Sequence, residues 1–128
     1  MKLLLDTCTF LWFNLDAPEL SPHARELCVE PQNDLYFSAI SAWEITLKQA
    51  LGRLPLPEPA AKYVPSRREA NGIASLELDE DSVLQLAKLP SLHNDPFDRM
   101  LICQAITHGL AIVTPDESIA QYPVRVLW

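Results

Sequence analysis

The chain has 128 residues, of which 48% are hydrophobic and 21% are charged. This length suits one domain that buries a core without disulfides, and the composition excludes a disordered or fibrous chain. The formal net charge of −7 argues against nonspecific nucleic-acid binding, because proteins of that class are usually basic. Residues 48–68 differ from the rest, since they hold five basic residues and one acid. This stretch is compatible with a phosphate-binding rim and equally with an ordinary solvated face.

Neither a membrane span nor a secretory leader is expected. The longest apolar runs are about five residues, far short of the ~20 that a span requires. Asp6 interrupts the N-terminal apolar run before a signal-peptide core is complete. The three cysteines are odd in number and lack metal-ligand spacing, so we expect reduced thiols in a cytoplasmic protein.

Short apolar runs and helix-capping residues predict the elements of the N-terminal half. Ser21 followed by Pro22 is typical of a helix start, and Gly52 is typical of a helix end. In chain order we expect a strand at 2–6, a helix to about 15, a helix from 21 to about 30, a strand at 35–38 and a helix from 41 to about 51. The proline-rich stretch 55–65 should hold only short helices, because Pro65 would interrupt a longer one.

The C-terminal half continues the alternation of strands and helices. Asp95 and Pro96 mark a helix start, and Gly109 marks its end. We expect a strand at 73–78, helices at 79–88 and 95–108, a strand at 110–114, a helical turn at 117–121 and a strand at 124–127. Strands alternate with helices and no hairpin turn joins two strands. The pattern therefore predicts a three-layer α/β/α fold with a mainly parallel sheet of about five strands, as one domain over residues 1–128.

Acidic residues should meet at one edge of this sheet, because ligands bind at the carboxyl ends of parallel strands. Asp6 ends the first strand, Glu44 lies in the first turn of the helix after the second strand, Asp98 lies in the first turn after Asp95, and Asp116 follows the fourth strand. Clustered carboxylates repel one another, and a divalent cation relieves the repulsion. Oxygen ligands favour Mg2+ or Mn2+ over zinc.

Each acid also has a purely structural interpretation. Asp6 and Asp95 stand where helix N-caps are expected, and Asp116 lies in a turn. Ser41-x-x-Glu44 fits a capping box, in which Glu44 would bond back to the Ser41 amide. The acids predict a metal site only as a set, because all of them fall near one edge of one sheet.

Several stretches of the chain together resemble the PIN-domain family. They are LLLDT (3–7), SAISAWEITLK (38–48), HNDPFDRMLI (93–102), IVTPD (112–116) and the ending YPVRVLW (122–128). Their order and spacing are those of the family, and the most similar subgroup is the VapC-type ribonuclease toxin of type II toxin–antitoxin systems. Cys8, where the subgroup often has histidine, and Pro115 depart from the pattern without removing a carboxylate.

The resemblance implies a magnesium-dependent endoribonuclease that cleaves RNA, forms a homodimer and is inhibited by a cognate VapB-type antitoxin. It assigns the metal-binding and catalytic roles to Asp6, Glu44, Asp98 and Asp116. Asp95 would be an accessory acid, Thr7 and Thr114 would be hydroxyl groups near the site, and Arg99 would contact a phosphate or pair with an acid. Two helices with more apolar residues than one buried stripe needs, 10–15 and 43–51, predict an interface or deep burial.

Two other classes of protein share this length and architecture. A phosphoacceptor signalling domain needs a lysine at the end of its fifth strand, and no lysine follows Lys88. A non-catalytic RNA-binding module would not need four acids at the sheet edge. The nuclease is therefore the function that we expect.

Overall fold

The computed structural model describes all 128 residues and contains a five-stranded sheet in the order β3-β2-β1-β4-β5. All neighbouring strands are parallel. The strands are β1 (Lys2–Leu5), β2 (Asp34–Ser38), β3 (Ala74–Leu76), β4 (Ala111–Val113) and β5 (Val126–Leu127). Strand β1 therefore lies at the centre of the sheet, and the strand order changes direction between β1 and β4.

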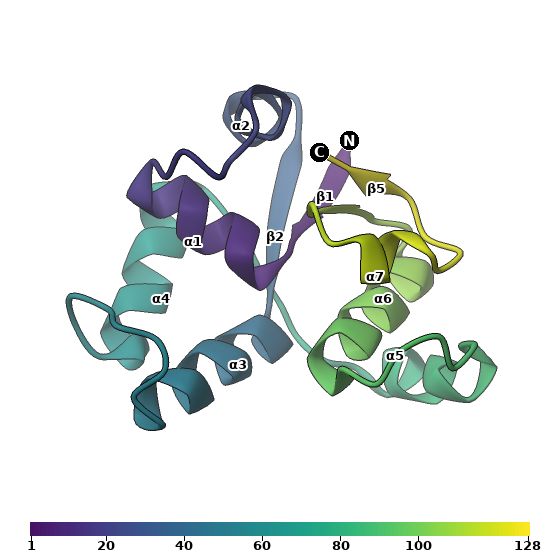
Figure 1. Ribbon diagram of the computed structural model, residues 1–128. Coiled ribbons are helices and arrows are strands. Elements are labelled where there is room, and N and C mark those ends of the chain that lie inside the picture. Colours follow the sequence, from purple (N-terminus) through teal and green to yellow (C-terminus); the bar gives the residue numbers. More distant parts are fainter.

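Helices cover both faces of the sheet (Figure 1). They are α1 (Thr7–Leu15), α2 (Pro22–Val29), α3 (Ala39–Ala50), α4 (Ala60–Ala70), α5 (Glu80–Leu84), the 3-10 helix η1 (Gln85–Lys88), α6 (Pro96–His108) and α7 (Glu117–Ala120). Figure 1 shows α1 and α4 on one side of the sheet and α5, α6 and α7 on the other. The predicted α/β/α fold with a parallel sheet is confirmed. None of the helices combines the length and the apolar character that a membrane crossing requires.

Strand β1 is buried on both faces. Successive side chains of a strand point in opposite directions, so Leu3 and Leu5 join the core with α1, α2 and α4, while Leu4 joins the core with α6 and α7. All three side chains are fully buried. This double burial explains why the strand is an unbroken apolar run, and it places Asp6 at a well-packed strand end.

The N-cap of helix α3 lies three residues before the predicted Ser41. Its N-cap is Ser38, the last residue of β2, whose hydroxyl accepts a hydrogen bond from the Ile40 N–H (3.0 Å). Ser41 lies inside the first turn, and its buried hydroxyl has no hydrogen-bond partner. The predicted capping box is therefore wrong, and Glu44 lies in the second turn of the helix rather than the first.

Helix α4 is 11 residues long and continues through Pro65 without a break. The prediction of only short helices in this stretch is therefore wrong. Pro65 lies on the exposed side of the helix, whereas the adjacent Tyr63 and Val64 are buried in the core. Proline removes one backbone hydrogen bond from the helix interior. The packing of the buried side chains compensates for that loss, because tertiary contacts override local propensity.

Candidate functional site

Carboxylates line a cavity of about 290 Å³ at the carboxyl ends of the central strands. The acids are Asp6, Glu44, Asp95, Asp98 and Asp116, and the other lining residues are Thr7, Cys8, Leu11, Lys48 and Leu54. The structure thus brings together all the acids that the sequence predicts for the site. They come from the ends of β1 and β4 and from the N-terminal halves of α3 and α6, at the point where the strand order changes direction.

Asp6 both caps α1 and lines the cavity. Its Oδ1 accepts a hydrogen bond from the Thr7 N–H (2.7 Å), and its Oδ2 accepts one from the Thr114 hydroxyl (2.8 Å). The residue is 5% exposed. Burial raises the pKa of Asp6 more than these hydrogen bonds lower it, and the nearby Glu44 raises it further. The structural and the functional interpretations of Asp6 are therefore compatible.

Cys8 lies beside Asp6, with its sulfur 3.6 Å from Asp6 Oδ2. Burial, followed by the charge of Asp6, raises the pKa of the Cys8 thiol to about 12. The thiol therefore stays protonated at neutral pH and donates to the carboxylate. A thiolate is the form of cysteine that binds metals, so this residue adds no soft ligand to the oxygen donors.

Glu44 is held by two partners that leave it 7% exposed. Its Oε1 accepts a hydrogen bond from the Thr7 hydroxyl (2.6 Å), and its Oε2 pairs with Lys48 Nζ (2.6 Å) one helical turn later. The hydrogen bond to Glu44 raises the pKa of Lys48. The sequence analysis missed this pair, although the i,i+4 spacing on a predicted helix was a signal for it.

Asp95 and Asp98 stand at the start of α6. Asp95 is the N-cap, and its Oδ1 accepts a hydrogen bond from the Asp98 N–H (3.0 Å). Burial, followed by the negative charges of Asp95, Asp6 and Asp116, raises the pKa of Asp98 to about 7, although a hydrogen bond from His93 opposes the rise. The repulsion expected among clustered carboxylates therefore adds to the effect of burial at Asp98, as it does at Asp6.

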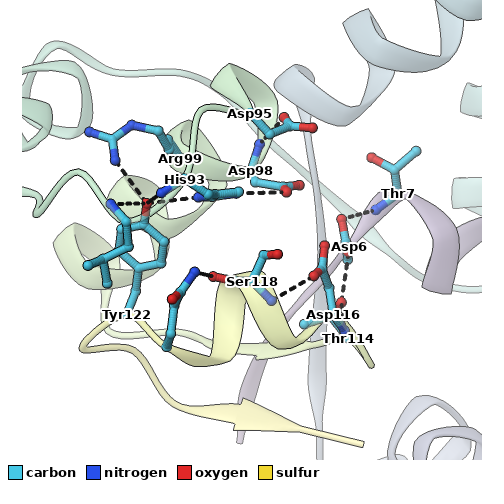
Figure 2. A network of polar contacts seen from close by, with 12 residues as sticks. Asp6, Thr7, His93, Asp95, Asp98, Arg99, Thr114, Asp116, Ser118 and Tyr122 are labelled. Atoms are coloured by element: carbon cyan, nitrogen blue, oxygen red, sulfur yellow. Dashed lines mark hydrogen bonds and ion pairs between the residues drawn. The ribbon is translucent and has the colours of Figure 1, made fainter.

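Asp116 caps α7 and is linked to Asp6 through Thr114. Its Oδ1 accepts a hydrogen bond from the Ser118 N–H (2.8 Å), and its own N–H donates to Thr114 Oγ1 (3.1 Å). Figure 2 shows the contact between Thr114 and Asp6, with Asp116 next to them. The Thr7 and Thr114 hydroxyls, both predicted near the site, thus each bond directly to an acid of the cavity.

Behind the acids lies a second polar group that the sequence analysis did not predict. His93 stands between Asp98 and Tyr122, with Nε2 3.1 Å from Asp98 Oδ2 and Nδ1 2.8 Å from the Tyr122 hydroxyl (Figure 2). Arg99 donates to the Pro90 carbonyl (2.8 Å) and to the Tyr122 hydroxyl (2.9 Å). Arg99 therefore pairs with no acid and does not line the cavity, whereas the accessory residues Asp95 and Thr7 do.

The donor set fits a hard divalent cation. All five acids offer oxygen ligands, which Mg2+ and Mn2+ prefer, and a bound cation would relieve the repulsion that, after burial, raises the pKa of Asp98. No group of three His, Cys, Asp or Glu side chains is arranged to hold a metal ion as it stands. Mg2+ usually keeps several water ligands and uses only one or two carboxylates, so a loosely convergent set of acids remains suitable for it.

Comparison with known proteins agrees with this architecture. Residues 3–124 match the family model of the PIN domain. The chain belongs to the PIN-domain family. Ribonuclease VapC16 of Mycobacterium tuberculosis is 44% identical over 55 residues, which are 43% of this chain and 39% of that protein. Ribonuclease VapC22 of the same organism is 26% identical over 121 residues, which are 94% of this PIN-domain chain and 91% of that protein.

A solved structure shares the fold over nearly the full length of this PIN-domain protein. It is the crystal structure of VapBC2 from Rickettsia felis bound to a DNA fragment from the VapBC2 promoter, with a TM-score of 0.74 and 13% sequence identity. The match covers 99% of this chain and 98% of that chain. At 13% identity the likeness to the Rickettsia felis structure establishes the PIN fold alone. The match to VapC16 spans well under two thirds of that relative's length.

Proposed function

We propose that this PIN-domain chain is a metal-dependent endoribonuclease that acts as the toxin of a VapBC-type toxin–antitoxin pair. The observation that carries the proposal is the convergence of Asp6, Glu44, Asp98 and Asp116 in one cavity at the sheet edge. The two curated relatives are named as VapC ribonucleases, and one of them aligns with 94% of this chain. Both observations support RNA as the substrate.

Asp6 and Asp98 are the acids that we assign as ligands of Mg2+ or Mn2+. Glu44 and Asp116 would hold a second ion or orient bound water, and Asp95 would act as an accessory acid. A cation held by these acids would supply an activated water and charge neutralisation at the phosphate for hydrolysis of the phosphodiester bond. Thr7 and Thr114 hold their carboxylates in place with hydrogen bonds of 2.6 Å and 2.8 Å.

Lys48 adds a cation at the rim of the same cavity. Its ammonium group is bonded to Glu44 and its side chain is half exposed, so it can approach a phosphate of the RNA without leaving the site. An ammonium group binds phosphate as a point charge. This arrangement supports binding of a polyanion by a chain whose net charge is −7.

We also propose a homodimer and an antitoxin partner. Of the two apolar helices that the sequence singled out, α1 is mostly packed against the core, whereas α3 exposes Trp43 and Leu47, and its C-cap residue Leu51, along one side. These residues are spaced one helical turn apart, and α3 also carries Glu44 and Lys48. An exposed apolar stripe beside a charged site is typical of a protein interface. A second copy or an antitoxin helix would cover it.

Residues 1–128 would form a single domain that works in the cytoplasm. One sheet with a core on each face supports the single domain. Three free cysteines, two of them buried, support a reducing compartment.

The decisive experiment is cleavage of total RNA by the purified chain during titration with Mg2+, with the 5′ ends of the products mapped by sequencing. We expect cleavage that depends on the cation, is abolished by a chelator and is suppressed by the product of the neighbouring gene. RNA binding without cleavage at any Mg2+ or Mn2+ concentration would indicate the non-catalytic RNA-binding module. A monomeric mass by light scattering at high micromolar concentration would contradict the homodimer.

A further inference from the structure

The hydroxyl of Tyr122 is surrounded by four polar groups. The N–H groups of Leu92 (3.2 Å) and His93 (3.1 Å) and the guanidinium of Arg99 (2.9 Å) all donate to its oxygen. The fourth neighbour is His93 Nδ1, at 2.8 Å. Figure 2 shows this group directly behind Asp98, on the side away from Asp6.

Counting donors and acceptors assigns the protons in this group. A phenolic oxygen has two lone pairs and one proton, and three N–H donors already share its two lone pairs. The hydroxyl proton can therefore go only to His93 Nδ1, which must be unprotonated in order to accept it. In a neutral imidazole the remaining proton is then on Nε2, where it donates to Asp98 Oδ2 at 3.1 Å.

The group is also packed tightly enough to hold its geometry. Tyr122 is 3% exposed, and its ring lies edge-on to the His93 ring with centroids 5.3 Å apart. The Arg99 guanidinium lies 5.9 Å from the centroid of the Tyr122 ring. The imidazole therefore has little freedom to rotate, and it bonds one Asp98 oxygen while Oδ1 accepts no hydrogen bond within the chain.

We propose that His93 is a positioning residue for Asp98 and that Tyr122 fixes the tautomer and orientation of His93, so that Asp98 presents Oδ1 to a divalent cation. The proposal rests on the proposed function in one respect, because it takes Asp98 as a cation ligand. It adds two residues that serve the cation site from outside the cavity. Hydrogen-bond partners of metal ligands commonly act in this way.

The chain order gives this arrangement a further consequence. Asp116 is the N-cap of α7, and Tyr122 follows the same short helix. One C-terminal segment thus supplies Asp116 directly and holds Asp98 through His93, so that two acids from distant parts of the chain depend on the same element.

Two substitutions of His93 separate the positioning role from mere packing. In the His93→Gln variant, the side-chain amide nitrogen can reach the position of Nε2 and donate a hydrogen bond to Asp98. In the His93→Asn variant, the shorter side chain reaches only the position of Nδ1, next to Tyr122. Tyr122→Phe removes the hydroxyl but keeps the buried ring. His108→Asn is the matched control, because His108 Nε2 makes a similar 3.1 Å contact with Asp79 Oδ1 far from the cavity.

The readout is the affinity for Mn2+ without RNA, measured by calorimetry and electron paramagnetic resonance, together with urea unfolding in chelator. We expect His93→Asn to weaken Mn2+ binding about 10- to 100-fold. His93→Gln should recover most of that loss, Tyr122→Phe should weaken binding several-fold, and His108→Asn should leave it unchanged. Wild-type affinity in His93→Asn, or no difference between the Asn and Gln variants, would overturn the proposal.

A measurement on the unaltered chain covers the case in which a variant fails to fold. Long-range nitrogen–proton NMR of the imidazole groups should show His93 as the Nε2–H tautomer in the metal-free protein, and the Nδ1–H tautomer would overturn the proposal. Failure of the proposed function looks different, because the wild-type chain would then neither bind Mn2+ in the cavity nor cleave RNA.

Discussion

Thr114 Oγ1 donates a hydrogen bond of 2.8 Å to Asp6 Oδ2, although 108 residues separate the two in the chain. They meet because β1 and β4 are parallel neighbours in which Leu5 pairs with Val113, so the next residue of each strand reaches the same edge. The same hydroxyl accepts a hydrogen bond from the Asp116 N–H. A single threonine therefore links two acids of the candidate metal site.

Asp6→Asn should abolish RNA cleavage while leaving the fold intact. Asparagine is as good an N-cap as aspartate, so α1 keeps its first turn, and the loss of a buried charge removes a desolvation cost. We expect the activity loss to exceed the roughly 100-fold that a lost outer hydrogen-bond partner can cost. Cleavage assays and urea unfolding in chelator test this, with the exposed Asp34→Asn as control. Full activity of Asp6→Asn at limiting Mg2+ would remove Asp6 from the site.

Glu44→Gln should reduce activity far more than stability. Glutamine keeps an oxygen for the Thr7 hydroxyl, and the lost ion pair with the half-exposed Lys48 contributes only about 0.5–1 kcal/mol. Unfolding free energy and turnover should be measured side by side, with Lys48→Gln breaking the same ion pair from the other end. A stability loss of several kcal/mol with unchanged turnover would show that Glu44 is purely structural.

Cation binding should strengthen as the pH rises from 6 to 8. The fold raises the pKa of Asp98 from 3.8 to about 7, and only the deprotonated carboxylate binds a metal ion. Below pH 7, calorimetry in buffers of different ionisation enthalpy should therefore detect proton release when Mn2+ binds. Asp98→Asn should remove this release, and release that is unchanged in the variant would assign it to another group.

The same raised pKa predicts the pH dependence of stability in chelator. A carboxyl group whose pKa is higher in the folded state stabilises the fold fully below its unfolded value of 3.8, and that contribution is lost as the pH rises through about 7. Wild-type protein should therefore lose unfolding free energy between pH 4 and 7 relative to Asp98→Asn. Parallel curves for the two proteins would contradict the prediction.

Pro65→Ala should stabilise the chain. Alanine restores an N–H in the middle of α4 at an exposed position, where proline costs ~3 kcal/mol, and this gain is partly offset by greater freedom of the unfolded chain. We expect a net rise of about 1–2 kcal/mol in the free energy of unfolding. Pro59→Ala is the control, because Pro59 is the N-cap of the same helix and should give no comparable gain. A loss of stability in Pro65→Ala would show that Pro65 has a packing role.

Local signals were sufficient for most of the fold. Helix α6 was predicted at both ends, because Asp95 bonds the amide of Asp98 and Gly109 adopts a left-handed φ of 67°. The start of α3 was not predictable in the same way, since Ser38 and Ser41 are equally good caps in the sequence. Ser38 also donates to Gln104 on α6, a contact across 66 residues that no local pattern contains.

The sequence by itself determined which acidic side chains line the candidate site and which sheet edge they reach, because the period of the strands and the positions of the caps are local properties. Only the tertiary structure decided which groups contact one another. Lys48 pairs with Glu44, Arg99 turns away from the acids, and Asp98 is linked through His93 to Tyr122, 29 residues further along the chain than His93. These pairings depend on side-chain orientation and on the packing of α6 and α7 against the sheet, which sequence spacing does not specify.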